Sequence, residues 1–253
     1  MMHEYFTNLA RTLATVDATV SERILDVLWQ TYQRDGSVIV CGNGGSAATA
    51  SHFACDLGKW TVVDGQRRFR AVALTDNMPL VTAWGNDTAY ERVFVEQIPM
   101  FYRPGDTLVA ISGSGNSPNV LRVSEWVQAQ GGLVVGMSGF GGGKLAALAD
   151  VPFVVQSSFM PEVEDVHIAL CHALAVNLAN RIRAVWALCY PRWWRHVRIC
   201  CHVGAGRWLA CPGGDTDYRR RCVVWWPGGG RRTHGAVVDA YSRLGRLCAS
   251  STL

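Results

Sequence analysis

The chain has 253 residues, 49% of them hydrophobic, and a net charge of +4, which is enough apolar material for one substantial α/β domain with a buried core. It has no apolar run of about eighteen residues that could span a membrane, and its first residues lack the basic, apolar pattern of a signal peptide. We therefore expect a soluble cytoplasmic protein without a membrane partner.

Charge and composition change near residue 184. Residues 1–183 carry 13 Lys and Arg against 17 Asp and Glu, whereas residues 184–253 carry 11 Arg against 3 Asp. Six of the ten Trp and six of the nine Cys also lie in the last segment, which has no Lys, Glu or Phe. We therefore predict a core domain over 1–183, beginning with a helical region at 1–35, and an atypical tail over 184–253.

The apolar residues of 3–34 recur at helical spacing, which predicts one long helix or two in series. The sheet of the same domain or a second subunit would cover this apolar stripe. Strands are predicted at 38–41, 69–74, 107–111, 133–137 and 151–155, and helices at 46–57, 79–84, 89–100, 120–130, 145–149 and 161–183. This alternation predicts an α/β fold with a doubly wound, parallel, five-stranded sheet flanked by helices.

Two loops rich in Gly and Ser follow the first and third predicted strands. The first is Gly42–Gly45, with Ser46 opening the next helix, and the second is Ser-Gly-Ser-Gly-Asn-Ser-Pro-Asn at 112–119. Free N–H groups, the helix dipole and short hydroxyl side chains suit a phosphate. Neither loop has a Walker ending or the spacing of a dinucleotide fingerprint. Because both loops end parallel strands, they predict one phosphate-ester pocket; a corner that only packs is the alternative.

Two of the predicted helices carry histidine and carboxylate side chains. His52 and Asp56 are four residues apart on one helix face, and Glu164 and His172 share a stripe on the last helix, with His167 to the side. Such a set can hold a divalent transition metal, and it can also provide acid and base groups for proton transfer. Ordinary surface or capping residues remain the alternative at this point.

Taken in order, these motifs resemble a sugar isomerase (SIS) domain. The resemblance covers about residues 1–183 and is most similar in type to the phosphoheptose isomerases, which convert sedoheptulose 7-phosphate to a heptose 7-phosphate. The residues that carry it are Gly42-Asn43-Gly44-Gly45-Ser46, Ser51-His52-Phe53-Ala54, Gly85-Asn86-Asp87, Ile111-Ser112-Gly113-Ser114-Gly115-Asn116-Ser117, and Val166-His167-Ile168 with His172.

The resemblance implies which residues bind the substrate. In the family the serines of the two loops hold the phosphate, and the first loop and the segment ending at Asp87 complete the site. Carried onto this chain, the substrate-binding set is Asn43, Gly44, Ser46, Asp87, Ser112, Ser114 and Ser117.

The resemblance also implies a catalytic metal centre. Its ligands here would be His52, Asp56, Glu164 and His172, holding one Zn²⁺ per site, and the catalytic residues would be Asp56, Glu164 and His172. The family has Glu in place of Asp56 and Gln in place of Glu164. Asp56 is one methylene shorter than Glu, and a misplacement of about 1 Å can cost on the order of a hundredfold in rate. Glu164 can compensate as the base or as an anionic ligand.

We therefore expect an aldose–ketose isomerase that converts sedoheptulose 7-phosphate to D-glycero-D-manno-heptose 7-phosphate through an enediol. The family implies a homotetramer with sites at subunit contacts, and no nucleic-acid partner is expected for the core domain. The alternative is a non-catalytic SIS protein that binds a sugar phosphate, or a tetrameric assembly factor for a replication initiator. The presence of both His52 and His172 favours the enzyme.

The tail over 184–253 does not resemble the family. Arg interleaved with Trp, as at Trp193-Trp194 and Arg219–Arg221, is typical of a segment that contacts nucleic acid or an acidic partner. The tail has no Cys-x-x-Cys pair for zinc, and a disulfide framework conflicts with a cytoplasmic protein. The alternative is a disordered or frame-shifted tail, because a GC-rich gene read in a shifted frame overproduces Arg, Gly, Trp, Cys and Pro.

Overall fold

The computed structural model describes residues 2–189, 199–203, 207–210, 222–226 and 230–232. The chain divides into two units, Met1–Arg183 and Ala184–Leu253. In the part of the chain that the structure describes, no helix has both the length and the apolar character needed to cross a membrane.

The first unit is built on a five-stranded parallel sheet with the order β2-β1-β3-β4-β5. The strands are β1 (Ser37–Cys41), β2 (Arg70–Ala73), β3 (Thr107–Ile111), β4 (Leu133–Ser138) and β5 (Val151–Val154). In this register Val40 of β1, the second strand in this order, lies between Ala73 and Val109. The predicted fold class, a doubly wound parallel sheet flanked by helices, is confirmed.

The helices are α1 (Met2–Ala14), α2 (Ala18–Gln33), α3 (Gly45–Lys59), α4 (Met78–Asp87), α5 (Pro118–Ala129), α6 (Gly143–Leu148) and α7 (Met160–Cys189). The amino-terminal region is two helices in series, because Asp17 interrupts the first and caps the second. Its Oδ1 accepts hydrogen bonds from the backbone N–H groups of Thr19 (2.7 Å) and Val20 (3.3 Å).

The prediction of a helix over 89–100 is wrong. This segment contains two short 3₁₀ turns, η1 (Tyr90–Arg92) and η2 (Ile98–Met100). Pro99 has no N–H to donate and disfavours the α conformation at Ile98, so a continuous helix cannot pass through it. Val93, Phe94 and Ile98 are nonetheless buried, and this burial accounts for the helix-like apolar pattern.

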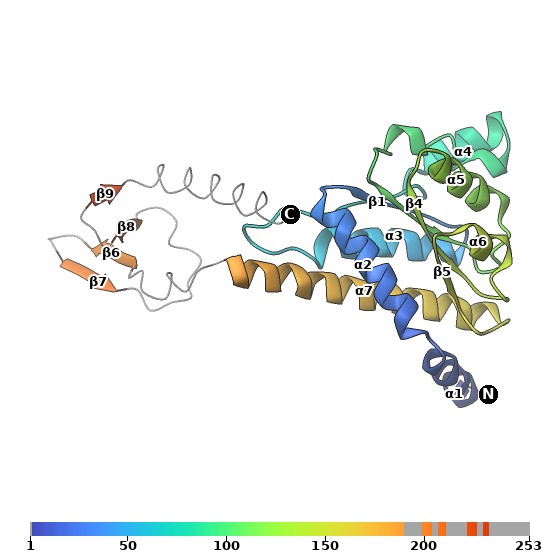
Figure 1. The fold of residues 1–253 in the computed structure, drawn as a ribbon, viewed down its shortest axis with the longest axis horizontal. Coiled ribbons are helices and arrows are strands. Elements are labelled where there is room, and N and C mark those ends of the chain that lie inside the picture. Colours follow the sequence, from blue (N-terminus) through green and yellow to red (C-terminus); the bar gives the residue numbers. More distant parts are fainter. Residues whose placement is uncertain (1, 190–198, 204–206, 211–221, 227–229, 233–253) are drawn as a thin grey trace. The chain divides into compact units, whose positions relative to one another are not determined.

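Helices cover both faces of the sheet, as Figure 1 shows. Side chains alternate along each strand, so Val38 and Val40 face one layer and Ile39 and Cys41 face the other. The first layer is formed by α2, α3 and α7, and the second by the segment 93–98, α5 and α6, with Val81 and Trp84 of α4 packed against it. Because α3 and α7 share one layer, residues about 120 positions apart in the sequence can meet there.

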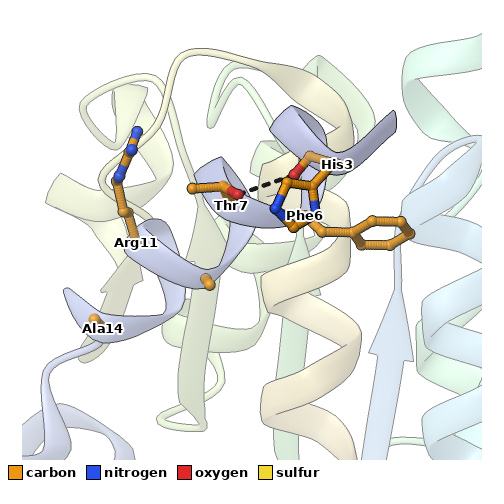
Figure 2. A pocket seen from close by; sticks show the side chains of 6 residues that line it. His3, Phe6, Thr7, Arg11 and Ala14 are labelled. Carbon is orange, nitrogen blue, oxygen red and sulfur yellow. Dashed lines mark hydrogen bonds between the residues drawn. The ribbon is translucent and has the colours of Figure 1, made fainter. Parts of the chain in front are cut away.

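The first helix, α1, contacts the start of α7 through polar groups. Tyr5 Oη donates to Asp165 Oδ2 (2.7 Å), and Thr12 Oγ1 donates to Glu162 Oε2 (3.0 Å). Another face of α1 is open and mostly apolar, and Figure 2 shows the Phe6 ring projecting from it, 58% exposed. The residues that line this face are His3, Phe6, Thr7, Ala10, Arg11 and Ala14.

The described part of the second unit contains the last residues of α7 and a four-stranded antiparallel sheet. Its strands are β6 (Ile199–Val203), β7 (Arg207–Ala210), β8 (Cys222–Trp226) and β9 (Gly230–Arg232), in the order β7-β6-β8-β9. The motifs at 193–194 and 219–221 lie outside the described residues. The alternatives stated for this tail therefore stay predictions.

Candidate active site

The two Ser- and Gly-rich loops lie at the topological switch point of the sheet. From β1 the chain crosses to β2 on one side and later to β3 on the other, so the loops after β1 and β3 flank the place where the strand order reverses. In open parallel sheets, ligands bind at this place, beyond the carboxyl ends of the strands. The fold therefore brings the two predicted phosphate loops to the same end of the sheet.

The first loop leaves the start of α3 open to a ligand. Gly44 is the N-cap residue, has a φ of +56° that favours glycine, and offers no side chain to the first N–H groups of the helix. Ser46 follows in the first turn and is buried. A Cβ on Gly42 would lie 2.6 Å from the carbonyl oxygen of Ser46, so the loop can pass this close to the helix only with glycine there.

The second loop presents hydroxyl groups at the start of α5. Ser112 Oγ donates to Ser117 Oγ (2.9 Å), and Ser117, although it is the N-cap residue, makes no capping hydrogen bond with its side chain. Ser114 Oγ accepts a hydrogen bond from the backbone N–H of Asn116 (3.2 Å). The hydroxyl hydrogens of Ser114 and Ser117 have no assigned acceptor among these contacts, so both can donate to a phosphate oxygen.

A Gly-rich turn at 139–144 contacts the backbone of the second loop. The backbone N–H of Gly139 donates to Gly113 O (2.8 Å), and that of Leu145 donates to Gly115 O (2.9 Å). Gly115 has a φ of +68°, and a Cβ there would lie 2.6 Å from the carbonyl carbon of Gly142. The second loop and the Gly-rich turn pack backbone against backbone, and this close contact fixes the path of the second loop.

Side-chain amides join the first loop to the second. Asn43 Nδ2 donates to Asn119 Oδ1 (2.9 Å), and Asn119 Nδ2 donates back to Asn43 Oδ1 (2.8 Å). Tyr90 Oη, from η1, also donates to Asn43 Oδ1 (3.0 Å). Asn43 is among the residues predicted from the sequence, whereas Asn119 and Tyr90 are not. The only signal for Asn119 was its place at the end of the second loop motif, directly after Pro118.

Three of the four predicted metal ligands lie together where α3 and α7 meet. The Nε2 atoms of His52 and His172 are 3.2 Å apart, and each lies 3.7 Å from Asp56 Oδ2. Both imidazole side chains are 50% exposed, whereas the Asp56 side chain is 20% exposed. The cluster is therefore open to solvent on its histidine side and anchored by a more enclosed carboxylate.

These three residues fit a transition metal such as zinc. Zinc binds imidazole nitrogen at about 2.0 Å in tetrahedral geometry, which separates two such nitrogens by about 3.3 Å. The 3.2 Å between the two Nε2 atoms matches this separation, and two imidazoles with one carboxylate are a frequent ligand set of catalytic zinc. The same distance also allows one imidazole N–H to donate to the other ring.

Glu164, the fourth predicted ligand, lies outside this cluster. A Cβ on Gly45 would lie 2.5 Å from Glu164 Cδ, so the Glu164 carboxylate packs against the backbone at the start of α3. Asp87 is exposed at the end of α4 and accepts a hydrogen bond from Asn86 Nδ2 (2.9 Å). The assignments of Glu164 to the metal and of Asp87 to the substrate stay predictions.

Two further titratable groups of α7 are buried and do not belong to the cluster. His167 is 1% exposed, and its Nε2 lies 3.2 Å from the carbonyl oxygen of Ser138, the last residue of β4. Burial lowers the pKa of His167 to about 4, so the ring is neutral at neutral pH. Burial raises the pKa of the Cys171 thiol, which therefore stays protonated. Neither group is suited to carry charge in a reaction.

Comparison with known proteins decides the family. The SIS domain family matches this chain over residues 4–139, which is more than half of its length. The chain belongs to the SIS domain family. A phosphoheptose isomerase of Trichlorobacter lovleyi is 34% identical to this SIS-domain chain over 189 residues, which cover 72% of this chain and 90% of that protein.

A second curated relative has a different name. The lincomycin biosynthesis protein LmbN of Streptomyces lincolnensis is 41% identical over 160 residues, which cover 59% of this SIS-domain chain and 58% of that protein. The chain therefore spans less than two thirds of the length of LmbN. Among solved structures, the phosphoheptose isomerase GmhA of Neisseria gonorrhoeae superposes with a TM-score of 0.66 at 31% identity, covering 71% of this chain and 97% of that one.

Proposed function

We propose that this chain is a phosphoheptose isomerase that converts sedoheptulose 7-phosphate to D-glycero-D-manno-heptose 7-phosphate. The observation that carries the proposal is the cluster of His52, Asp56 and His172 in a SIS domain, which brings together α7 and α3, the helix that follows the first phosphate loop. Relatives named phosphoheptose isomerase, such as that of Trichlorobacter lovleyi, support the choice of sugar.

The substrate phosphate binds between the starts of α3 and α5. The open N–H groups after Gly44 and the hydroxyls of Ser46, Ser114 and Ser117 supply donors, with Ser112 holding Ser117 in place. Two helix N-termini converge on this position, and their dipoles favour an anion. A phosphate bound there leaves the sugar chain to extend along α3 toward His52.

The reaction moves a proton between neighbouring carbons. A base removes a proton from C1 of the ketose, an enediol forms, and a proton returns at C2 while a hydroxyl proton passes from O1 to O2. Of the predicted catalytic residues, Asp56 and His172 lie beside His52, at the end of the site where C1 and C2 would bind, whereas Glu164 lies against the phosphate loop at the C7 end. His52, Asp56 and His172 would hold zinc, which when bound supplies a Lewis acid beside the sugar oxygens.

The active form is a homotetramer in the cytoplasm. The open apolar face of α1 around Phe6 supports a subunit contact, because burying such a face on a second copy removes apolar surface from water (Figure 2). Light scattering of the purified chain would measure its mass, and a monomer would contradict this part of the proposal.

The test is conversion of sedoheptulose 7-phosphate by the full chain in D₂O, with and without zinc. We expect deuterium to enter the sugar, and we expect His172→Ala to abolish this exchange. Asn177→Ala, an exposed change on the same helix, is the control and should leave exchange unchanged. Tight binding of the sugar phosphate without any exchange would contradict the enzyme and support the non-catalytic class.

A further inference from the structure

The reciprocal amide pair of Asn43 and Asn119 is an unusual connection between two loops. Asn119 is only 1% exposed, in the first turn of α5, whereas Asn43 is half-buried in the loop after β1. The two hydrogen bonds, 2.9 Å and 2.8 Å, join residues 76 positions apart. A buried amide that is satisfied in this way holds its partner firmly, because breaking the pair would leave buried polar groups unpaired.

The orientation of both amides follows from one backbone group. The backbone N–H of Val120 donates to Asn119 Oδ1 (3.0 Å), and an N–H donor requires an oxygen at that position. The Asn119 nitrogen must therefore face Asn43, and it can pair only with the Asn43 oxygen. Neither amide can be turned over without placing two donors or two acceptors against each other.

The pairing leaves Asn43 with one kind of free group. Its oxygen already accepts from Asn119 Nδ2 and from Tyr90 Oη, which uses both lone pairs. Its nitrogen donates one hydrogen to Asn119 Oδ1 and keeps a second N–H without an assigned acceptor. Asn43 can therefore act toward a ligand only as a donor.

We propose that Asn119 is a positioning residue, which fixes the Asn43 amide before substrate binds so that its free N–H donates to an acceptor oxygen of the sugar phosphate. The proposal rests on the proposed function, because it takes the sugar phosphate as the ligand at these loops. Tyr90 assists by saturating the Asn43 oxygen from outside. Asn119 itself touches no substrate; it acts through Asn43.

A double-mutant cycle tests whether Asn119 acts through Asn43. Asn43→Ala and Asn119→Ala should each raise KM for sedoheptulose 7-phosphate about tenfold, the range for one lost hydrogen bond, and change kcat less than about threefold. The double variant should resemble Asn43→Ala alone, since nothing remains to be positioned. A KM increase of about a hundredfold in the double variant, the product of the single effects, would overturn the proposal.

Further measurements separate this proposal from the proposed function. Tyr90→Phe removes one exposed hydroxyl, so this variant should fold even if Asn119→Ala does not. It should raise KM about threefold when introduced into the wild-type chain and leave KM unchanged when introduced into Asn43→Ala. The same cycle in Kd for the sugar phosphate needs no turnover, so coupling in Kd without isomerisation contradicts only the proposed function. If the sugar phosphate does not bind, the side-chain amide NMR signal of Asn43 still tests the positioning role. A signal that Asn119→Ala leaves unchanged would overturn this role, and a signal that Asn119→Ala shifts would support it.

Discussion

Gly115 should be the least replaceable residue of the second loop. Its φ of +68° costs a residue with a side chain about 1–2 kcal/mol. A Cβ there would also lie 2.6 Å from Gly142 C and 3.0 Å from Gly143 Cα, and both obstacles are backbone atoms that cannot rotate away. Forcing backbone apart adds about 1–3 kcal/mol, so Gly115→Ala should lower the free energy of unfolding by about 2–5 kcal/mol.

Gly131→Ala is the matched control, because Gly131 has a similar φ of +73° and no atom within 4 Å of its Cβ position. It should cost only the backbone strain of about 1–2 kcal/mol. For a domain of this size, about 1 kcal/mol corresponds to about 2–4 °C in Tm. Thermal melts followed by circular dichroism should show a loss of Tm in Gly115→Ala that is about 1.5 to 4 times the loss in Gly131→Ala. Equal losses of Tm in the two variants would contradict a backbone-to-backbone contact between the second loop and the Gly-rich turn at 139–144.

Three other predictions follow from the described contacts. Zinc should raise the Tm of wild type and a chelator should reverse it, whereas His52→Ala should show neither response by differential scanning fluorimetry. The pKa of His167 is about 4 in the folded chain and about 6.5 in the unfolded chain, so between these pH values the unfolded chain binds one more proton than the folded chain. The free energy of unfolding should therefore fall by up to about 3 kcal/mol as the pH drops from about 6.5 to about 4. The fall should be smaller in His167→Gln, and urea titrations at several pH values would measure both. Tyr5→Phe removes the hydrogen bond to Asp165 and should lower the free energy of unfolding by about 1 kcal/mol, also measured in urea.

The strands and loops of the sheet could be predicted because their signals are local. The segment 107–111 is a continuous apolar run between turn residues, and it forms β3 with every residue buried. The helices next to the loops could be located in the same way. The error at 89–100 arose because Val93, Phe94 and Ile98 are buried, and burial produces an apolar pattern whether or not the backbone is helical.

The site was only partly accessible from the sequence. A four-residue spacing places His52 and Asp56 on one helix face, but their meeting with His172 depends on α3 and α7 packing in one layer. Glu164 is eight residues before His172, about 12 Å along a helix, so spacing alone did not decide whether it joins the cluster. The Asn43–Asn119 pair is purely tertiary, and no local pattern encodes a contact across 76 residues.

The order in which the ribosome produces the site has a consequence for metal loading. His52 and Asp56 emerge on α3, but His172 follows 120 residues after His52, which takes roughly 6–24 s at ordinary rates of synthesis. During that interval the nascent chain offers two ligands on one exposed helix. The third arrives only when α7 docks beside α3, so a nascent chain gains its full three-ligand set only as the last layer of the domain closes.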